Sequence, residues 1–283
     1  MVSNLQFDRI RKLALELAGI ELVERHQELL NHRFRRLGIL DEAGLDTFLS
    51  EAESGDPAAT RRLVHLLTTK FTGFFRHPAQ FKLAAEHAME VTRRGGVARL
   101  WSAGAATGEE PYSLAMALVE AFGRDDPPAS VLATDVDAEA LAVGERGEYA
   151  ESALRDLERS RRERFFVQRP NERTLAMTPS LRRIVEFRTV NLVRADWAVE
   201  GPFDVIMVRN VLMYLESGHR DHVLRRMLGR LAPEGLLMID PVEGLGSMGS
   251  QFLDRGDGVY LARLDACKMR SGMPIAGEEY SRN

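Results

Sequence analysis

The sequence predicts an α/β protein in which a small all-helical N-terminal region precedes an open, mainly parallel β-sheet. Three observations support this expectation. Residues 5 to about 92 carry apolar side chains at helical spacing and show no strand-like alternation. From Val97 onward, short apolar runs alternate with helical patterns, which is typical of parallel strands joined by helices. Between the second and third of these strands, two short apolar runs flank a turn and predict an added β-hairpin.

Composition and charge exclude several classes of protein. The chain has 283 residues, of which 45% are hydrophobic and 28% charged, as expected for one large or two modest globular domains. A net charge of −4 disfavours a general nucleic-acid binder, which usually carries a basic excess. The single cysteine, Cys267, excludes an intramolecular disulfide and a cysteine-rich zinc site. Because we find neither a membrane-length apolar run nor a signal-peptide core, we expect a cytoplasmic protein without direct membrane insertion.

Residues 1–92 are expected to form the helical N-terminal domain. Its second helix, expected from about Leu22 to Leu37, is rich in basic side chains: Arg25, His26, His32, Arg33, Arg35 and Arg36. The simplest interpretation of such a run is a solvated helix face. The alternative is a surface that binds an acidic partner helix.

An aromatic segment, residues 72–76, follows the helices of this region. Two adjacent aromatic residues are unusual in a plain connector, and we expect Phe74 and Phe75 to dock one domain on the other. Thr72 and Arg76 then remain available for polar contacts.

A strand, a glycine turn and a helix open the second domain, which we place at residues 93–283. An apolar run precedes Gly104, and the helix that follows Gly108 has Leu114, Leu118 and Phe122 at four-residue spacing. This unit places a helix N-terminus at the carboxyl end of a first strand, where nucleotide-type ligands bind.

The charge of this turn narrows the choice of ligand. Glu109 and Glu110 follow Gly108, whereas a phosphate-binding loop has Lys and Ser/Thr there. A pyrophosphate would meet a repulsion of about 1–4 kcal/mol per nearby like charge. The turn therefore favours a cationic ligand without phosphate, such as S-adenosylmethionine. In the alternative, Thr107 and Glu110 form a capping box, and the acids only suit the helix dipole.

The remaining strands are expected at residues 130–134, 185–190, 203–208 and 236–239, with a terminal strand at 259–263. The helix before the strand at 236–239 is expected to stop at Pro233-Glu234-Gly235. The second strand of the sheet ends at Asp135, at the position where an acid holds a ribose diol. The next two strands are followed by Asn191-Leu192 and by Arg209-Asn210. The inserted hairpin is expected at about residues 160–183, after a charged helix from Arg155 to Arg164.

Five motifs occur in one particular order along the chain: Thr72-Gly-Phe-Phe-Arg76, Trp101-Ser-x-Gly-x-x-Thr-Gly-Glu-Glu-Pro-Tyr-Ser113, Thr134-Asp-x-Asp137, Val190-Asn-Leu192 and Phe203-Asp-x-x-x-x-Arg-Asn-Val-x-x-Tyr214. In this order they resemble the CheR family, the bacterial chemoreceptor glutamate O-methyltransferases. The resemblance covers nearly the whole chain. It implies a Rossmann-like S-adenosylmethionine methyltransferase sheet, with the helical domain closing over the cofactor and an inserted β-hairpin subdomain.

The resemblance also implies site residues. The family's cofactor contacts fall on Lys70, Thr72, Arg76, Gly104, Glu109, Asp135, Asn191, Leu192, Arg209 and Asn210. Its catalytic positions fall on Tyr214, which lies near the transferred methyl group in the family, and on Arg76, which borders the methyl-donor pocket. No metal is implied.

The chain departs from the family pattern at three places. Lys70 stands where the family usually has Asn, and Asp240-Pro241-Val242-Glu243 stands where it commonly has Gly-His-Ser-Glu. The hairpin turn also looks shorter than in members that are tethered to a receptor's C-terminal pentapeptide, so we expect an enzyme that is independent of the pentapeptide. The resemblance implies an acidic receptor helix as the partner, and we expect Arg33 and Arg36 to dock it. We expect a monomer that binds no nucleic acid.

Three functions remain open at this point. The first is methyl transfer to chemoreceptor glutamates. The second is a divergent or non-catalytic relative that binds S-adenosylmethionine as a sensory or scaffold module, an option raised by Lys70 and Asp240-Pro241. The third, a dinucleotide oxidoreductase, is disfavoured by Glu109 and Glu110.

Overall fold

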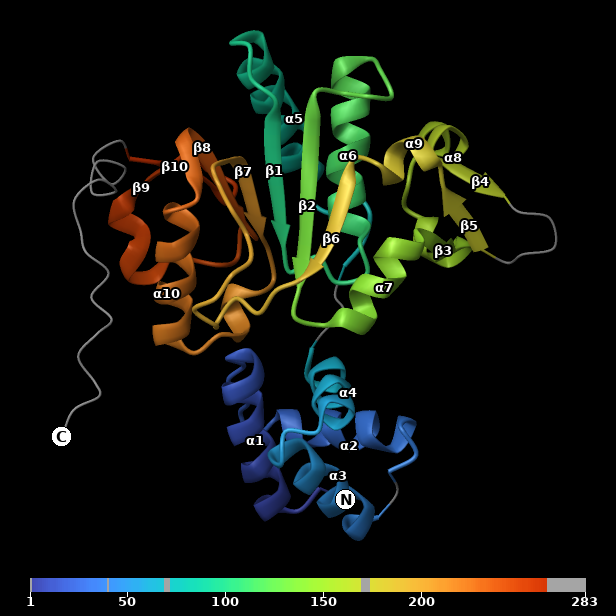
Figure 1. Cartoon of the computed structure of the whole chain (residues 1–283), viewed down its shortest axis with the longest axis vertical. Helices are drawn as coiled ribbons and strands as arrows, with labels where there is room; N and C mark the ends of the chain where they lie inside the picture. Colours follow the sequence, from blue (N-terminus) through green and yellow to red (C-terminus); the bar gives the residue numbers. More distant parts are fainter. Residues whose placement is uncertain (1, 40, 69–71, 169–173, 264–283) are drawn as a thin grey trace.

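The computed structural model describes residues 2–39, 41–68, 72–168 and 174–263, and Figure 1 shows a helical bundle lying below an α/β sheet. The bundle consists of α1 (Asn4–Ala18), α2 (His26–Arg36), α3 (Glu42–Glu53) and α4 (Pro57–Leu67). Three of these helices begin at a side-chain N-cap: Ser3 forms a capping box with Gln6, and Asp41 and Asp56 accept bonds from the first-turn N–H groups of α3 and α4. Their apolar faces meet in one separate core.

The main sheet has seven strands in the order β6-β2-β1-β7-β8-β10-β9. Its members are β1 (Ala98–Ala103), β2 (Ala129–Asp135), β6 (Val185–Thr189), β7 (Phe203–Val208), β8 (Leu231–Ile239), β9 (Phe252–Asp254) and β10 (Val259–Ala262). From β6 to β8 the neighbouring strands are parallel, and β10 runs antiparallel to both of its neighbours, β8 and β9. The chain order reverses on either side of β1, which creates a switch point at the carboxyl ends of β1, β2 and β7. The predicted open sheet is confirmed.

Strand β8 differs from the prediction at its beginning. Residues 233–235 were expected to follow a helix and precede the strand, but α10 (Ser217–Leu228) ends earlier and β8 already begins at Leu231. The register with β7 shifts between Phe203 and Val205, so residues 232–235 bulge out of the ladder. A bulge tolerates Pro233, which has no N–H to donate, and Glu234 with its positive φ of 64°.

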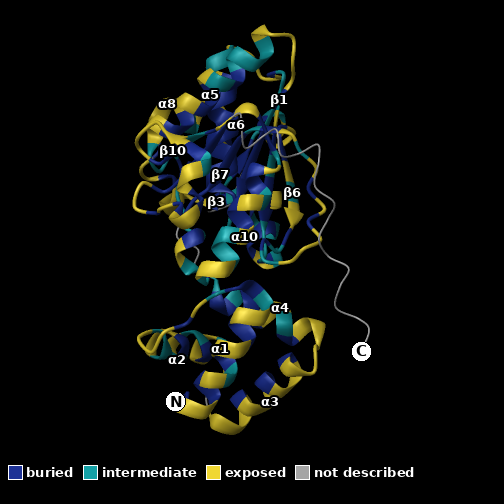
Figure 2. Ribbon diagram, turned by 90° about the vertical axis from the view of Figure 1, so that its left-hand side faces the viewer, coloured by how far each residue is buried: buried dark blue, intermediate teal, exposed yellow. Residues whose placement is uncertain are grey.

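Helices cover both faces of the sheet. On one face, α5 (Pro78–Arg93) and α6 (Glu109–Phe122) share a core with β1, β2 and β7. On the other face, α10 and the segment 190–202 complete a second core. Figure 2 shows the buried residues concentrated along the sheet and inside the bundle. Although α5 precedes the expected domain boundary at residue 92, it packs on the sheet; the boundary itself stays a prediction.

The inserted region forms a three-stranded antiparallel sheet with the order β3-β5-β4. The predicted hairpin is confirmed by β4 (Phe166–Gln168) and β5 (Thr174–Met177). The additional strand β3 (Glu148–Ala150) was not predicted, because three residues are too few to show alternation. The expected charged helix is shorter than predicted, since α8 spans only Arg159–Phe165. The hairpin turn at 169–173 lies outside the described residues.

Two short helices complete the fold: α7 (Ala138–Arg146), packed against α4, β2 and β6, and α9 (Pro179–Arg182). Of the helices in the described ranges, none is long and apolar enough to cross a membrane.

Candidate active site

A cavity of about 1000 Å³, its open mouth included, lies between the helical bundle and the carboxyl ends of the parallel strands. The bundle contributes Ala18, Ile20, Leu67 and Thr68 to its wall. The sheet and its loops contribute nine of the predicted site residues: Thr72, Arg76, Gly104, Asp135, Asn191, Leu192, Arg209, Asn210 and Tyr214. The structure therefore brings together residues that the sequence spreads over more than half of the chain. Lys70 lies outside the described residues.

The glycine turn after β1 forms the floor of this cavity. Gly104 has a φ of 88°, and a Cβ atom there would lie 2.2 Å from Cγ2 of Val211, so a side chain is excluded. The N–H groups of Gly104 and Ala105 both donate to the carbonyl of Thr134, at 2.7 and 2.9 Å. The turn is thereby fixed against the end of β2.

Asp135, at the end of β2, is oriented by backbone donors on both carboxylate oxygens. The N–H of Ala106 donates to Oδ2 and the N–H of Asp137 to Oδ1, each at 2.9 Å. A carboxylate offers about four acceptor sites, which is enough for these bonds and for the hydroxyl groups of a ligand diol. This arrangement suits the predicted ribose contact.

The two glutamates after Gly108 have different surroundings, and the predicted capping box is wrong. Glu110 accepts a hydrogen bond from the Ser102 hydroxyl at 2.8 Å and pairs with Nε of Arg209 at 2.8 Å, which cancels its charge. Helix α6 has no side-chain cap, because Glu110 is engaged inside the protein and the Thr107 hydroxyl donates to Oε2 of Glu109 at 2.7 Å. The charge argument from the sequence counted both acids, whereas only one is without a bound guanidinium.

Glu109 was predicted as a cofactor contact, but it does not line the cavity. Its carboxyl is buried, and burial raises its pKa against the opposing effect of hydrogen bonds from Thr107 and Thr72. Its position at the first turn of α6 lets it hold Thr72, which does line the cavity.

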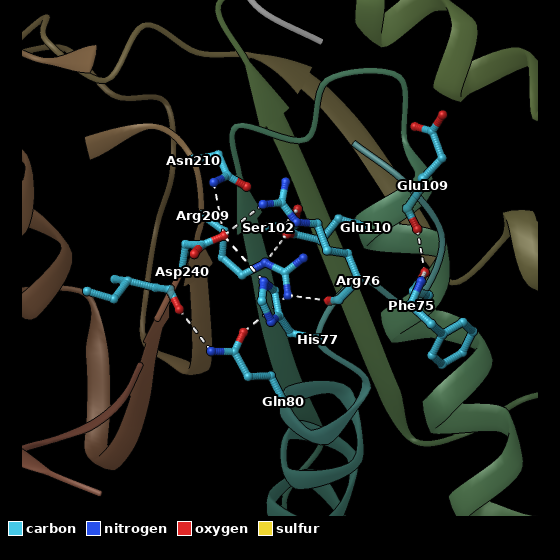
Figure 3. A network of polar contacts seen from close by, with 12 residues as sticks. Phe75, Arg76, His77, Gln80, Ser102, Glu109, Glu110, Arg209, Asn210 and Asp240 are labelled. Atoms are coloured by element: carbon cyan, nitrogen blue, oxygen red, sulfur yellow. Dashed lines mark hydrogen bonds and ion pairs between the residues drawn. The ribbon is translucent and has the colours of Figure 1, made fainter. Parts of the chain in front are cut away.

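Arg209 ties the end of β7 to the segment before α5. Its Nη1 donates to the carbonyl of Arg76 at 2.7 Å and to Oε1 of Gln80 at 3.1 Å, and the guanidinium lies 5.2 Å from the ring centre of Phe81 (Figure 3). Through its contacts with Glu110, Gln80 and the Arg76 carbonyl, the guanidinium joins three segments of the cavity wall to one another.

Asp240, at the end of β8, connects two of the predicted residues (Figure 3). Its Oδ2 accepts a hydrogen bond from Nδ2 of Asn210 at 2.9 Å and lies 3.3 Å from Nη2 of Arg76 and 3.5 Å from Nε2 of His77. Burial would raise the pKa of Asp240, but the N–H of Val242, the Asn210 amide and the charges of Arg76 and His77 together lower it. The sequence marked Asp240 as a departure from the family but gave it no partner.

Four non-glycine residues around the cavity adopt positive φ angles: Phe75 (52°), His77 (60°), Ala106 (47°) and Asn210 (55°). Each such conformation costs about 1–3 kcal/mol and persists only where its surroundings hold it. The Phe75 N–H donates to the Ser113 hydroxyl at 2.9 Å, and Phe74 packs edge-on against Tyr149 and Phe166 of the small sheet. Phe74 therefore anchors the loop on the inserted sheet and belongs to the core shared by α5 and α6, so its predicted role in docking one domain on the other stays a prediction. The loop is held in a conformation that sequence propensity disfavours.

The bundle is fastened to the sheet at the rim of the cavity. Ile20 pairs with Leu215 in an isolated antiparallel bridge, and the Glu21 N–H donates to the carbonyl of Tyr214 at 2.9 Å. Asn191, predicted as a cofactor contact, donates its amide N–H to the carbonyl of Leu17 at 2.6 Å. The wall of the cavity and the attachment of the bundle thus use the same residues.

A second attachment joins α4 to the N-terminus of α7. Asp137 accepts a bond from the Thr68 hydroxyl at 2.9 Å, lies 3.1 Å from Nδ1 of His65, and caps α7 through the N–H groups of Glu139 and Ala140. Asp137, the last acid of the Thr134-Asp-x-Asp137 motif, therefore has a structural role, whereas Asp135, two residues earlier, lines the cavity.

The two arginines predicted to dock a partner have different environments. Arg33 directs its Nη1 at the carbonyls of Leu66, Leu67 and Thr68, the last two at 3.2 Å, and so caps the C-terminal end of α4. Arg36 is exposed. Arg33 is consequently engaged within the protein, which corrects the expectation of an equivalent pair.

The charge of the cavity wall fits the predicted cofactor. Among the described residues of the wall and their partners, each of the ion pairs Arg209–Glu110 and Arg76–Asp240 is neutral, and the carboxylate of Asp135 adds a negative charge, which favours a sulfonium over a phosphate. Within the described ranges no cluster of side chains suits a metal ion. Fold and site together define an S-adenosylmethionine-dependent methyltransferase.

Comparison with known proteins identifies the family. Residues 70–255 match the family model described as CheR methyltransferase, SAM binding domain. The chain belongs to the CheR methyltransferase family. It is 37% identical over 233 residues to chemotaxis protein methyltransferase 2 of Pseudomonas aeruginosa, covering 81% of this chain and 83% of that protein. It is 36% identical over 268 residues to the chemotaxis protein methyltransferase of Salmonella typhimurium, covering 93% and 92%.

Among solved structures, a TehB-like SAM-dependent methyltransferase from Corynebacterium glutamicum matches this chain with 14% identity and a TM-score of 0.35, and the match covers 65% of this chain and 97% of that one.

Proposed function

We propose that this protein transfers methyl groups from S-adenosylmethionine to glutamate side chains of a bacterial chemoreceptor. The observation that carries the proposal is the convergence of Arg76, Asn210 and Tyr214 on the wall of the cavity that also contains Asp135. Arg76, Asn210 and Tyr214 supply polar contacts for a carboxylate. The carboxylate of Asp135 can accept hydrogen bonds from the ribose hydroxyls of the cofactor. The similarity to proteins named chemotaxis protein methyltransferases supports the choice of acceptor.

The chemistry needs no general base. A receptor glutamate has an ordinary pKa of about 4.3 and is ionised at neutral pH. When bound, S-adenosylmethionine supplies a methyl group on a cationic sulfur that leaves as a neutral thioether. The protein's task is to align the carboxylate and replace water around it by fixed dipoles, and alignment alone supplies about 7–11 kcal/mol in favourable cases.

Individual residues have distinct roles in this proposal. The Tyr214 hydroxyl orients the acceptor carboxylate by hydrogen bonding, and Asp135 binds the ribose hydroxyls. Arg76 and Asn210 hold the part of the wall next to the methyl donor. Thr72 and Leu192 complete the cofactor's enclosure.

The receptor contact is proposed to lie on α2. Arg36 and Arg35 are exposed there, and an acidic receptor helix is complementary to them. We further propose that the protein acts in the cytoplasm as a monomer and does not depend on a receptor's C-terminal pentapeptide, so that these charges carry more of the encounter than they would in a tethered enzyme.

Radiolabelled methyl transfer tests the proposal directly. The purified protein is incubated with labelled S-adenosylmethionine and receptor cytoplasmic fragments, with and without the terminal pentapeptide, and alkaline release of labelled methanol distinguishes a carboxyl ester from other methylation. We expect base-labile label on both fragments and none on fragments whose acceptor glutamates are replaced by alanine. Tight binding of S-adenosylhomocysteine without transfer to any receptor would contradict the proposed activity.

A further inference from the structure

Asp240 occupies an unusual place beside the cavity. It directly follows β8, at the position where the family commonly has the glycine of Gly-His-Ser-Glu. Its side chain is only 1% exposed. It does not line the cavity, whereas two of its partners, Arg76 and Asn210, do. Any influence of Asp240 on a ligand therefore passes through these neighbours and through its charge.

The contacts of Asp240 join three separate segments. Oδ2 binds the Asn210 amide at 2.9 Å and lies 3.3 Å from the Arg76 guanidinium, while Oδ1 accepts the Val242 N–H at 3.2 Å (Figure 3). Asn210 itself has a positive φ of 55°, and its N–H donates to Oε2 of Glu243 at 2.9 Å. The carboxylate of Asp240 thus holds Asn210, which has a strained backbone, and the Arg76 guanidinium in place, and both residues line the cavity.

The charge of Asp240 matters as well as its geometry. Two arginines belong to the cavity wall, and a buried carboxylate accompanies each: Glu110 lies 2.8 Å from Arg209, and Asp240 lies 3.3 Å from Arg76. Removing the negative charge of Asp240 makes the wall more positive by one unit. A cationic ligand would feel that change and a neutral one would feel it far less.

We propose that Asp240 is a positioning residue that holds Arg76 and Asn210 in the cavity wall, and that its charge shifts the ratio of affinities toward the cationic methyl donor, relative to a site without that charge. Substrate and product differ in the sulfonium charge and in one methyl group, and they share the adenosine, the ammonium and the carboxylate. The ratio of their affinities therefore isolates the charge effect from general damage to the site. The inference rests on the cofactor of the proposed function and not on the acceptor.

Calorimetry with the full chain tests this role without any receptor. Dissociation constants for S-adenosylmethionine and S-adenosylhomocysteine are compared in wild type and in Asp240→Asn, which removes the charge but keeps an oxygen for the Asn210 amide. We expect the affinity for S-adenosylmethionine to fall about three- to ten-fold more than that for S-adenosylhomocysteine. Asp240→Glu, which keeps the charge, is expected to retain most of the wild-type ratio.

Two further variants make the result decisive. Glu234→Gln removes the same charge from the same strand at its other end, where Glu234 pairs with Arg94 at 2.8 Å on the surface, and should leave the ratio unchanged. The double variant Arg76→Gln with Asp240→Asn removes both charges and should bring the ratio back toward wild type, even where overall affinity falls. It also tests the idea if Asp240→Asn alone folds poorly.

An equal loss of affinity for both ligands in folded Asp240→Asn would overturn the proposal, as would a double variant whose ratio stays as low as that of the single one. Neither result bears on the acceptor. Conversely, failure to methylate any receptor fragment would refute the proposed acceptor and leave the affinity ratios interpretable.

Discussion

Replacing Arg209 by methionine should be one of the most destabilising single changes at the site. The side chains of Arg209 and Glu110 are only 3% and 9% exposed, so the change leaves a buried carboxylate with the Ser102 hydroxyl and no cation. Removing one partner of a buried pair costs about 3–5 kcal/mol. The bonds to the Arg76 carbonyl and to Gln80 are lost as well, and their loss places the expected cost at the upper end of that range.

Urea unfolding at neutral pH measures this cost, and the protein supplies a matched control. The surface pair Arg94–Glu234 has the same 2.8 Å separation, but its side chains are 63% and 57% exposed. Arg94→Met should therefore change the free energy of unfolding by less than about 1 kcal/mol. The double variant Arg209→Met with Glu110→Met should be more stable than the sum of the single effects predicts. If Arg209→Met costs no more than Arg94→Met, burial is not what gives this pair its importance.

Four further outcomes are expected. Asp135→Ala should weaken S-adenosylhomocysteine binding by about 1–3 kcal/mol in calorimetry, and an unchanged affinity would remove Asp135 from the ligand site. Tyr214→Phe should lower kcat for receptor methylation with little change in cofactor affinity; wild-type turnover would show that the ring only packs. Arg36→Ala should raise the KM for receptor and flatten its dependence on added salt, and identical kinetics at low and high salt would place docking elsewhere. Because burial raises the pKa of Glu109, the folded state holds the proton of this carboxyl more tightly than the unfolded state does. The contribution of Glu109 to the free energy of unfolding therefore falls as pH rises from about 4.5 through the raised pKa. In Glu109→Gln that part of the pH dependence of urea unfolding should disappear, and an unchanged profile would contradict the assignment.

Local sequence patterns predicted most of the fold. Apolar runs in the sequence predicted the parallel strands. Gly104 and Gly108 predicted a turn, and both have positive φ angles in the structure. Strands β3 and β9 were missed because three residues cannot display a period of two. The bulge at Pro233 was mistaken for the boundary of a helix, since proline and glycine mark both.

The site was predicted less completely, for a different reason. Nine of the cavity-lining residues followed from the family motifs, whereas the residues that the bundle adds to the wall and the partners of the charged side chains did not. Arg209 meets Glu110, and Asp240 meets Arg76, across the fold and far apart in sequence. Likewise, nothing in the basic run of α2 indicates that Arg33 turns toward the end of α4 while Arg36 stays exposed. Such pairings are fixed by tertiary packing.

The division of the cavity between bundle and sheet has a consequence for how the enzyme exchanges its ligand. Under the proposed function, the polar groups that contact the cofactor come from the sheet side, while the bundle adds the apolar side chains of Ala18, Ile20 and Leu67 to the wall. The family model begins at residue 70, so we expect a fragment cut there to keep the polar wall, lose the apolar one and release the cofactor faster. In the intact chain, hydrogen bonds around Leu17, Gly19 and Glu21 join the bundle to the sheet at the rim of the cavity, and we expect their loss to speed release of cofactor and product.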